Sequence, residues 1–248
     1  MALGTEAGRV DLGDVPDLRA PKHGSRTPGR TWSFASRAAS GSSPFARSAV
    51  PAQPERPAAL ILAGGRAERL GGAEKLLLVL AGQTILERIL AALADDVAAV
   101  ALSANGDPAR FARFGLPVLP DGPFAGEGPL AGLLAGLDWA AALGASTLLT
   151  VPGDTPFLPT RLASRLAPAP AVAASAGRRH HLVALWPVAA RAALAARLAA
   201  PGPRAVGAFA ATLGPHAVEF PTEPRDPFLN INTPSDLAHA RAIAEGGA

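Results

Sequence analysis

The sequence contains no cysteine and no tyrosine, and only two of its 23 basic residues are lysines. Without cysteine, the chain can form neither disulfides nor thiolate metal sites. It also lacks any run of 18 or more uninterrupted apolar residues, so no transmembrane helix is predicted. These absences fit a cytoplasmic protein with no membrane partner.

The formal charge of +3 is confined to the N-terminal part of the chain. Residues 1–50 carry seven Lys or Arg and four Asp or Glu, whereas the remaining residues carry 16 of each. The balanced part offers no charge argument for binding nucleic acid or an anionic membrane. No nucleic acid partner is therefore expected.

Residues 1–55 are rich in Ser, Gly, Pro, Arg and Ala and show no sustained apolar period. Such composition predicts a disordered tail. Arginines among serines resemble a transit peptide, but three aspartates argue against one, and no apolar segment of a secretory signal follows a basic start. A second interpretation is a start codon placed too early, with the true start at Val50. Residues 56–248 are predicted to form a single domain.

From Pro57 onward, short apolar strands alternate with segments of helical spacing. The first strand is predicted at residues 58–62 and the first helix at 84–93. Further strands are predicted at 97–102, 116–119, 146–151, 171–175, 182–186 and 217–220. Further helices are predicted at 108–114, 129–143, 161–166, 188–198 and 204–213, with a last one after the N-cap Thr233. This order predicts an α/β fold with a mostly parallel sheet and helices on both faces.

A glycine-rich loop follows the first strand, between Leu62 and Lys75. Its glycines, Gly64 and Gly65 among them, let backbone N–H groups approach an anion closely, and Arg69 and Lys75 can neutralise phosphate charge. The spacing matches neither a P-loop nor a dinucleotide-binding fingerprint. An ordinary flexible loop is the alternative. The position after a buried strand, together with the only lysine outside the tail, favours phosphate binding.

Two aspartates, Asp121 and Asp154, come just after predicted strands, at the sheet edge where α/β proteins bind ligands. A lone carboxylate there suits Mg²⁺, which takes one or two carboxylates plus substrate phosphates. Asp154 is therefore a candidate metal ligand, or else a cap of the turn before Pro156. Asp121 precedes a helix start of small residues at 128–132, which allows either close approach of a base or sugar or merely tight helix packing.

Residues 226–234 read Asp-Pro-Phe-Leu-Asn-Ile-Asn-Thr-Pro. Asn230 and Asn232 alternate around an isoleucine, so both amides point to one side of an extended segment. They can hold an acceptor or bond the helix entry, and Asn230 is the better site candidate. The pair His180-His181 lacks further convergent metal ligands and is predicted to lie in a solvent loop, with an acceptor contact as the second interpretation.

Together, the loop 62–75, the segment 121–137, the run VPGDTPFLP at 151–159 and the run DPFLNINTPSDL at 226–237 resemble molybdenum cofactor guanylyltransferases. The resemblance covers about residues 57–244. It implies a Rossmann-like nucleotidyltransferase domain over 56–248. It also implies transfer of GMP from GTP to molybdenum-loaded molybdopterin, with Mg²⁺ as cofactor and pyrophosphate as product. The implied protein partners donate molybdopterin or are molybdoenzymes that accept the product.

The resemblance also assigns roles to individual positions. GTP contacts fall to the nucleotide loop and to the ends of later strands: Leu62, Ala63, Gly64, Gly65, Lys75, Ser103, Asp121 and Asp154. Catalysis falls to Lys75, Arg69 and Asp154, and acceptor contacts to His180, Asn230 and Asn232. Ser103 stands where the family commonly has Asn, so that contact is either lost or made by the serine hydroxyl. Glu74 replaces a common Asp, and His181 a Pro.

Three alternatives remain open. A CTP-dependent or sugar-phosphate nucleotidyltransferase would share the fold. Relatives that use CTP tend to read Ala-Ala-Gly where this chain reads Ala63-Gly64-Gly65, so the resemblance favours GTP. A non-catalytic nucleotide-binding adaptor is the third alternative, and the presence of both Lys75 and Asp154 argues against it.

Overall fold

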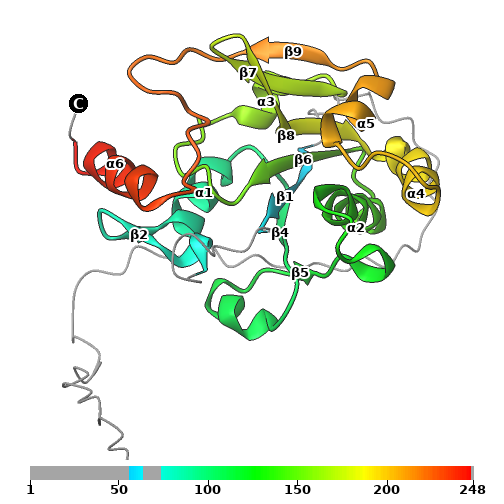
Figure 1. Ribbon diagram of the computed structural model, residues 1–248, viewed down its shortest axis with the longest axis horizontal. Helices are drawn as coiled ribbons and strands as arrows, with labels where there is room; N and C mark the ends of the chain where they lie inside the picture. Colours follow the sequence, from blue (N-terminus) through cyan, green and yellow to red (C-terminus); the bar gives the residue numbers. More distant parts are fainter. Residues whose placement is uncertain (1–55, 64–73, 247–248) are drawn as a thin grey trace, which may run out of the picture. The chain divides into compact units, whose positions relative to one another are not determined.

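A computed structural model of the protein describes residues 56–63 and 74–246, all within one compact unit. Its centre is a seven-stranded sheet in the order β5-β4-β1-β6-β8-β7-β9 (Figure 1). The strands are β1 (Ala58–Leu62), β4 (Ala99–Ser103), β5 (Val118–Leu119), β6 (Thr147–Pro152), β7 (Ala171–Ser175), β8 (Arg178–Pro187) and β9 (His216–Glu219). The expectations for residues 1–55 and for Gly64, Gly65 and Arg69 fall outside the described residues.

The sheet is mostly parallel, as the alternating order of elements predicts. Strand β1 pairs in parallel with β4 and β6, β4 with β5, and β7 with β9. Strand β8 is antiparallel to both of its neighbours, β6 and β7. An antiparallel strand has its beginning where its parallel neighbours end, and this reversal matters for the site.

Helices cover both faces of the sheet, which confirms the predicted fold class (Figure 1). Alternate residues of β1 face opposite cores. Ile61 packs with residues of α1, α3 and α6, whereas Leu60 packs with residues of α2, α4 and α5. The helices are α1 (Ile85–Leu93), α2 (Pro129–Ala142), α3 (Leu162–Leu166), α4 (Arg191–Ala199), α5 (Val206–Thr212) and α6 (Pro234–Ala244). No helix among the described residues is long and apolar enough to cross a membrane.

The first and last helices begin with reciprocal caps that the sequence encodes locally. At α6, the Thr233 hydroxyl accepts from the Asp236 N–H at 3.1 Å, and the Asp236 carboxylate accepts from the Thr233 N–H at 2.9 Å. Pro234 occupies the first helical position, as predicted. The same arrangement of Thr84 and Glu87 starts α1. These caps fix where the chain leaves the site and enters each helix.

Short elements escaped prediction. A two-stranded hairpin, β2 (Val79–Leu80) and β3 (Gln83–Thr84), turns at Ala81 and Gly82 with φ of 46° and 81°. Its strands are too short to show an apolar alternation. The predicted helix at 188–198 divides into a 3₁₀ turn, η5 (Val188–Ala190), and α4. Further 3₁₀ segments are η2 (Lys75–Leu77), η3 (Pro108–Phe114) and η4 (Gly122–Phe124).

Strand β8 corrects the prediction for the histidine pair. The strand begins at Arg178 rather than at residue 182, so His180 and His181 belong to the sheet and not to a solvent loop. The polar run Arg-Arg-His-His gives no apolar pattern by which a strand could be predicted. This part of the strand is stabilised instead by pairing with the buried strand β7. Along β7, Val172 pairs with Ala184 and the next residue pairs with His180, so residues 181–183 bulge out of the ladder.

Candidate functional site

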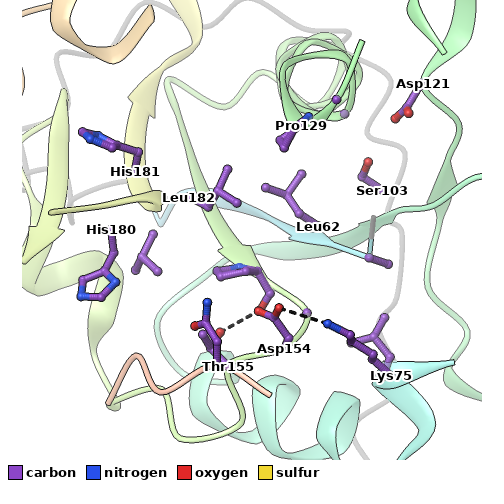
Figure 2. A pocket seen from close by; sticks show the side chains of 18 of the residues that line it. Leu62, Lys75, Ser103, Asp121, Pro129, Asp154, Thr155, His180, His181 and Leu182 are labelled. Carbon is purple, nitrogen blue, oxygen red and sulfur yellow. Dashed lines mark hydrogen bonds and ion pairs between the residues drawn. The ribbon is translucent and has the colours of Figure 1, made fainter. Parts of the chain in front are cut away.

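A pocket of about 590 Å³ lies at the carboxyl ends of β1, β4 and β6, a volume typical of small-molecule sites. Leu62, Ser103 and Pro152, the last residues of these strands, line it. Figure 2 shows Ser103 and Asp121 on one side and His180 and His181 on the other. We call these sides the strand-end side and the β8 side.

Lys75 and Asp154 meet within the pocket (Figure 2). The Lys75 Nζ lies 3.7 Å from Asp154 Oδ2 and donates a hydrogen bond of 2.8 Å to Asn232 Oδ1. The side chains of Lys75 and Asp154 are only 18% and 21% exposed. A compact ammonium with three donors suits a position between two oxygen ligands and an incoming anion.

Backbone contacts hold Asp154 in place. The Gly153 N–H donates to the Leu62 carbonyl at 2.9 Å, and a side chain at position 153 would press against that same carbonyl. The Asp154 carbonyl accepts from the Ile231 N–H at 3.0 Å. Ile231 is fully buried, so this bond brings the flanking Asn230 and Asn232 to the site.

The Asp154 carboxyl is poised for a cation. Burial raises its pKa, although Lys75 and hydrogen bonds act in the opposite direction. Its Oδ1 is buried and has no hydrogen-bond partner among the described residues. No group of three or more His, Asp or Glu converges as a complete metal cage within the described part of the chain. A single free carboxylate oxygen fits Mg²⁺, which completes its shell with phosphate oxygens and water.

The strand-end side is a shallow cradle of small and polar groups. The N-terminus of α2 contributes Gly128, Pro129 and Gly132 to the lining. A Cβ at Gly132 would collide with the Ser103 hydroxyl, so only glycine lets the helix approach β4 this closely. Asn105 Nδ2 donates to Asp121 Oδ2 at 2.7 Å, and its Oδ1 accepts from the Asp121 N–H at 3.1 Å.

Arg110 joins segments of this side without lining the pocket itself. Its Nη2 donates to the Asn105 carbonyl at 2.6 Å, and its Nε lies 3.1 Å from Glu74 Oε2. Glu74 immediately precedes Lys75, and Asn105 holds Asp121. One guanidinium therefore ties the segment that carries Lys75 to the loop that carries Asp121.

The β8 side carries the only run of cationic and imidazole groups that lines the pocket among the described residues. Arg178, Arg179, His180, His181 and Leu182 line it from β8, and Asn230 lines it from the loop before α6. The bulge at residues 181–183 turns consecutive side chains toward the pocket. Burial lowers the pKa of His180, with Arg178 and His181 acting in the same direction and Asp226 and Glu219 against it.

The structure brings most of the sequence-predicted site residues together. Those that line the pocket are Leu62, Ala63, Lys75, Ser103, Asp121, Asp154, His180 and Asn230. Asn232 reaches the site through its bond to Lys75, while Gly64, Gly65 and Arg69 lie outside the described residues. Sequence reasoning missed Arg178 and Arg179. The turn at Ala176-Gly177, which starts β8 directly before them, was the available signal.

Fold and site together define a class: a Rossmann-like α/β domain with a paired lysine and aspartate in a pocket at its strand ends. Residues 59–214 match the MobA-like NTP transferase domain. The chain belongs to this family, and relatives that are 62% and 48% identical place it among the molybdenum cofactor guanylyltransferases.

Individual comparisons agree. The molybdenum cofactor guanylyltransferase of Acidiphilium cryptum is 62% identical over 184 residues, which span 74% of this chain and 93% of that protein. The one from Rhodopseudomonas palustris strain HaA2 is 48% identical over 78% of this chain and 94% of its own length. The crystal structure of molybdopterin-guanine dinucleotide biosynthesis protein A from Archaeoglobus fulgidus superposes with a TM-score of 0.58 at 21% identity. It covers 76% of this chain and 99% of the archaeal chain, which shows the shared fold.

Proposed function

We propose that the protein transfers GMP from GTP to molybdenum-loaded molybdopterin, which yields molybdopterin guanine dinucleotide and pyrophosphate. The observation that carries the proposal is the meeting of Lys75 and Asp154 in a pocket with two chemically distinct sides. The base and ribose of GTP would occupy the strand-end side, near Ser103 and Asp121. Molybdopterin would occupy the β8 side, near His180 and Asn230.

The reaction is an in-line displacement at the α-phosphorus of GTP. An oxygen of the terminal phosphate of molybdopterin forms the new P–O bond, and the bond to the β-phosphate breaks. That phosphate is already ionised near neutral pH, so no general base is needed. The chain must align two anions and neutralise their charge. Lys75 does so for the GTP phosphates, with Arg69 as a proposed second cation.

Asp154 would hold Mg²⁺ through its unpartnered Oδ1. When bound there, the ion supplies Lewis-acid polarisation of phosphate oxygens. Asn232 supports the site indirectly, because its Oδ1 accepts a hydrogen bond from the Lys75 ammonium and so orients it. Ser103 and Asp121 offer a hydroxyl and a carboxylate to the nucleoside, and the Asn105 amide holds Asp121 in place. The small Gly132 leaves room beside Ser103.

Release of pyrophosphate tests the function. The protein is mixed with molybdenum-loaded molybdopterin and Mg²⁺ and then given GTP, CTP or ATP, with Lys75→Ala as the control for this site. Release with GTP alone, lost in the variant, supports the proposal. Release with CTP would keep the phosphate chemistry and overturn the base assignment. No pyrophosphate release with any of the three nucleotides would favour a nucleotide-binding adaptor.

A further inference from the structure

Three polar side chains from separate segments meet at the β8 side of the pocket. The Ser175 hydroxyl, at the end of β7, lies 2.7 Å from His180 Nε2 on β8. The same hydroxyl lies 3.0 and 3.1 Å from the two carboxylate oxygens of Asp226, in the loop after β9. Ser175 is 1% exposed, and the Asp226 carboxylate is itself fixed by the Phe228 N–H at 2.9 Å.

The donors and acceptors in this chain of bonds fix the tautomer of His180. A carboxylate only accepts hydrogen bonds, so the single proton of the Ser175 hydroxyl goes to Asp226. The serine oxygen can then offer His180 only a lone pair. Nε2 must therefore carry the ring proton, and in the neutral imidazole Nδ1 carries a lone pair.

This order of residues excludes nucleophilic catalysis by Ser175. In a catalytic triad the histidine lies between serine and aspartate and takes the serine proton. Here the serine lies in the middle, is buried and does not line the pocket. The cluster instead orients a ring that does line the pocket. His180 also packs at 4.8 Å against the Phe228 ring, which limits its rotation.

The surroundings of His180 favour the neutral ring. Burial is the largest influence on its pKa and lowers it, and the positive charge of Arg178 and the neighbouring His181 lower it as well. Asp226 and Glu219 oppose this without reversing the direction. Nδ1 has no hydrogen-bond partner among the described residues. A neutral ring with a free lone pair repels phosphate oxygens and attracts N–H or O–H donors.

We propose that Ser175 and Asp226 are positioning residues that present His180 Nδ1 as a hydrogen-bond acceptor to the organic part of the acceptor substrate. His180 thereby selects an N–H or O–H donor there and leaves the phosphate of the acceptor to Arg178 and Arg179. The proposal rests on the proposed function for the identity of the substrate. The tautomer itself does not depend on that function.

The tautomer is measured first, on the full chain with ¹⁵N-labelled histidine. Long-range ¹H–¹⁵N spectra distinguish a protonated Nε2 from a protonated Nδ1, and His180→Gln assigns the signals. We expect Nε2–H in the wild type, and loss of this single tautomer in Ser175→Ala. Wild-type His180 with its proton on Nδ1, or as an even mixture, would overturn the proposal.

Kinetics then separate positioning from folding. Ser175→Ala and Asp226→Asn should each raise the KM for molybdopterin about tenfold, the worth of one hydrogen bond, and leave the KM for GTP within about twofold. Ser164→Ala is the matched control, because it removes a 2.5 Å serine–aspartate bond to Asp96, and neither residue lines the pocket. It should change neither KM. An equal rise in both KM values, or none in that for molybdopterin, contradicts the proposal.

Binding distinguishes this inference from the proposed function. Molybdopterin added without nucleotide should shift the ¹⁵N resonance of His180 Nδ1 in the wild type, the signal that His180→Gln identifies by its absence. If the shift occurs while no nucleotide supports transfer, the proposed reaction fails and the positioning role stands. If molybdopterin shifts other resonances and leaves Nδ1 unmoved, the positioning role fails.

Discussion

Asp154 illustrates how a functional residue differs from a stabilising one. A salt bridge that stabilises a fold lowers the pKa of its carboxyl, yet burial raises the pKa of Asp154 despite Lys75 at 3.7 Å. The folded state therefore holds the proton more tightly than the unfolded chain does. From the ordinary carboxyl range up to the raised pKa, folding loses stability as the pH rises. Above that range the buried, ionised group is destabilising, unlike the carboxylate of a stabilising salt bridge.

We expect Asp154→Asn to separate activity from stability. The amide removes the carboxylate that faces the phosphates, so turnover should fall at least about a hundredfold, as for the loss of one electrostatic group in other active sites. Because the cost of burying an ionised carboxylate is then removed, while Lys75 keeps its hydrogen bond to Asn232, the midpoint of thermal unfolding of the metal-free protein at neutral pH should be unchanged or higher. Pyrophosphate release and a thermal melt measure the two quantities.

Asp138→Asn is the control for this experiment. Asp138 forms a 3.1 Å ion pair with Arg191 on the surface, where both side chains are more than half exposed. Such pairs contribute little to stability. Neither activity nor the melting midpoint should change. A clear drop in melting midpoint for Asp154→Asn alone would mean that the buried carboxylate stabilises the fold, contrary to the argument from its pKa.

The 3₁₀ helix η3 has a role that its sequence does not announce. Asp107 caps it by accepting from the Ala109 N–H at 2.9 Å, and this fixes the direction of Arg110. Arg110 then bonds the Asn105 carbonyl and pairs with Glu74. A partly exposed arginine in a short helix thereby holds the segment that begins with Glu74 next to Asn105, on the strand-end side of the pocket.

We expect Arg110→Ala to raise the KM for GTP by about tenfold, because the bridge is a charge-assisted contact rather than a surface pair. The KM for molybdopterin should stay within about twofold. Arg113→Ala is the matched control, since both arginines stack on the phenylalanine that follows them, at 4.9 and 4.6 Å, and Arg113 bonds to none of the described residues that line the pocket. Equal effects of the two substitutions would show that the bridge to Glu74 and Asn105 is unimportant.

Helix α2 packs against the sheet through two glycines one turn apart, Gly132 and Gly136. A Cβ at Gly136 would lie 2.5 Å from Leu60 Cδ2 and 3.1 Å from Leu148 Cδ2, and both leucines are fully buried. Alanine in place of glycine favours a helix by about 1 kcal/mol. Overpacking a close-packed core costs about 1–3 kcal/mol, so the clash should prevail.

We therefore expect Gly136→Ala to lower the free energy of unfolding, net, by up to about 2 kcal/mol, as the difference of those two effects. Urea unfolding of the variant, compared with Leu60→Val and with the double variant, tests the cause. Leu60→Val removes the atom in conflict, so the double variant should be more stable than the sum of the single effects predicts. Additive effects would place the strain elsewhere.

The sequence revealed elements where local pattern and tertiary burial agree. Continuous apolar strands such as β1 and capped helices such as α6 were predicted within a residue or two. The prediction for β8 was too short. The first half of this strand is polar and is stabilised by pairing with β7, which no local sequence pattern shows. The hairpin β2–β3 was missed because two-residue strands have no period. Ser175 and Asp226 could not be paired from sequence, since they lie 51 residues apart and their direct hydrogen bond forms only when the loop after β9 returns to the end of β7.

At the scale of the whole molecule, the reversal of β8 joins the two sides of the pocket. Strands β1, β4 and β6 end at one edge of the sheet, where the strand-end side of the pocket lies. Because β8 runs antiparallel to β6, its beginning, from Arg178 to Leu182, reaches the same edge. A fully parallel sheet would present a strand end there and not this polar run. One topological change therefore adds the β8 side to the pocket at the strand ends.

We expect residues 51–248 alone to be sufficient for folding and transfer. The family match covers residues 59–214, and 74% of this chain accounts for 93% of the Acidiphilium cryptum relative. The pocket-lining residues in the described part of the chain lie between Leu62 and Asn230. The shortened chain should therefore keep kcat and both KM values within about twofold and unfold at the same temperature within about 2 °C, which is no more than the shift that 1 kcal/mol produces in a domain of this size. A rise of tenfold or more in the KM for GTP would instead assign the N-terminal segment, with its net charge of +3, a part in attracting the nucleotide.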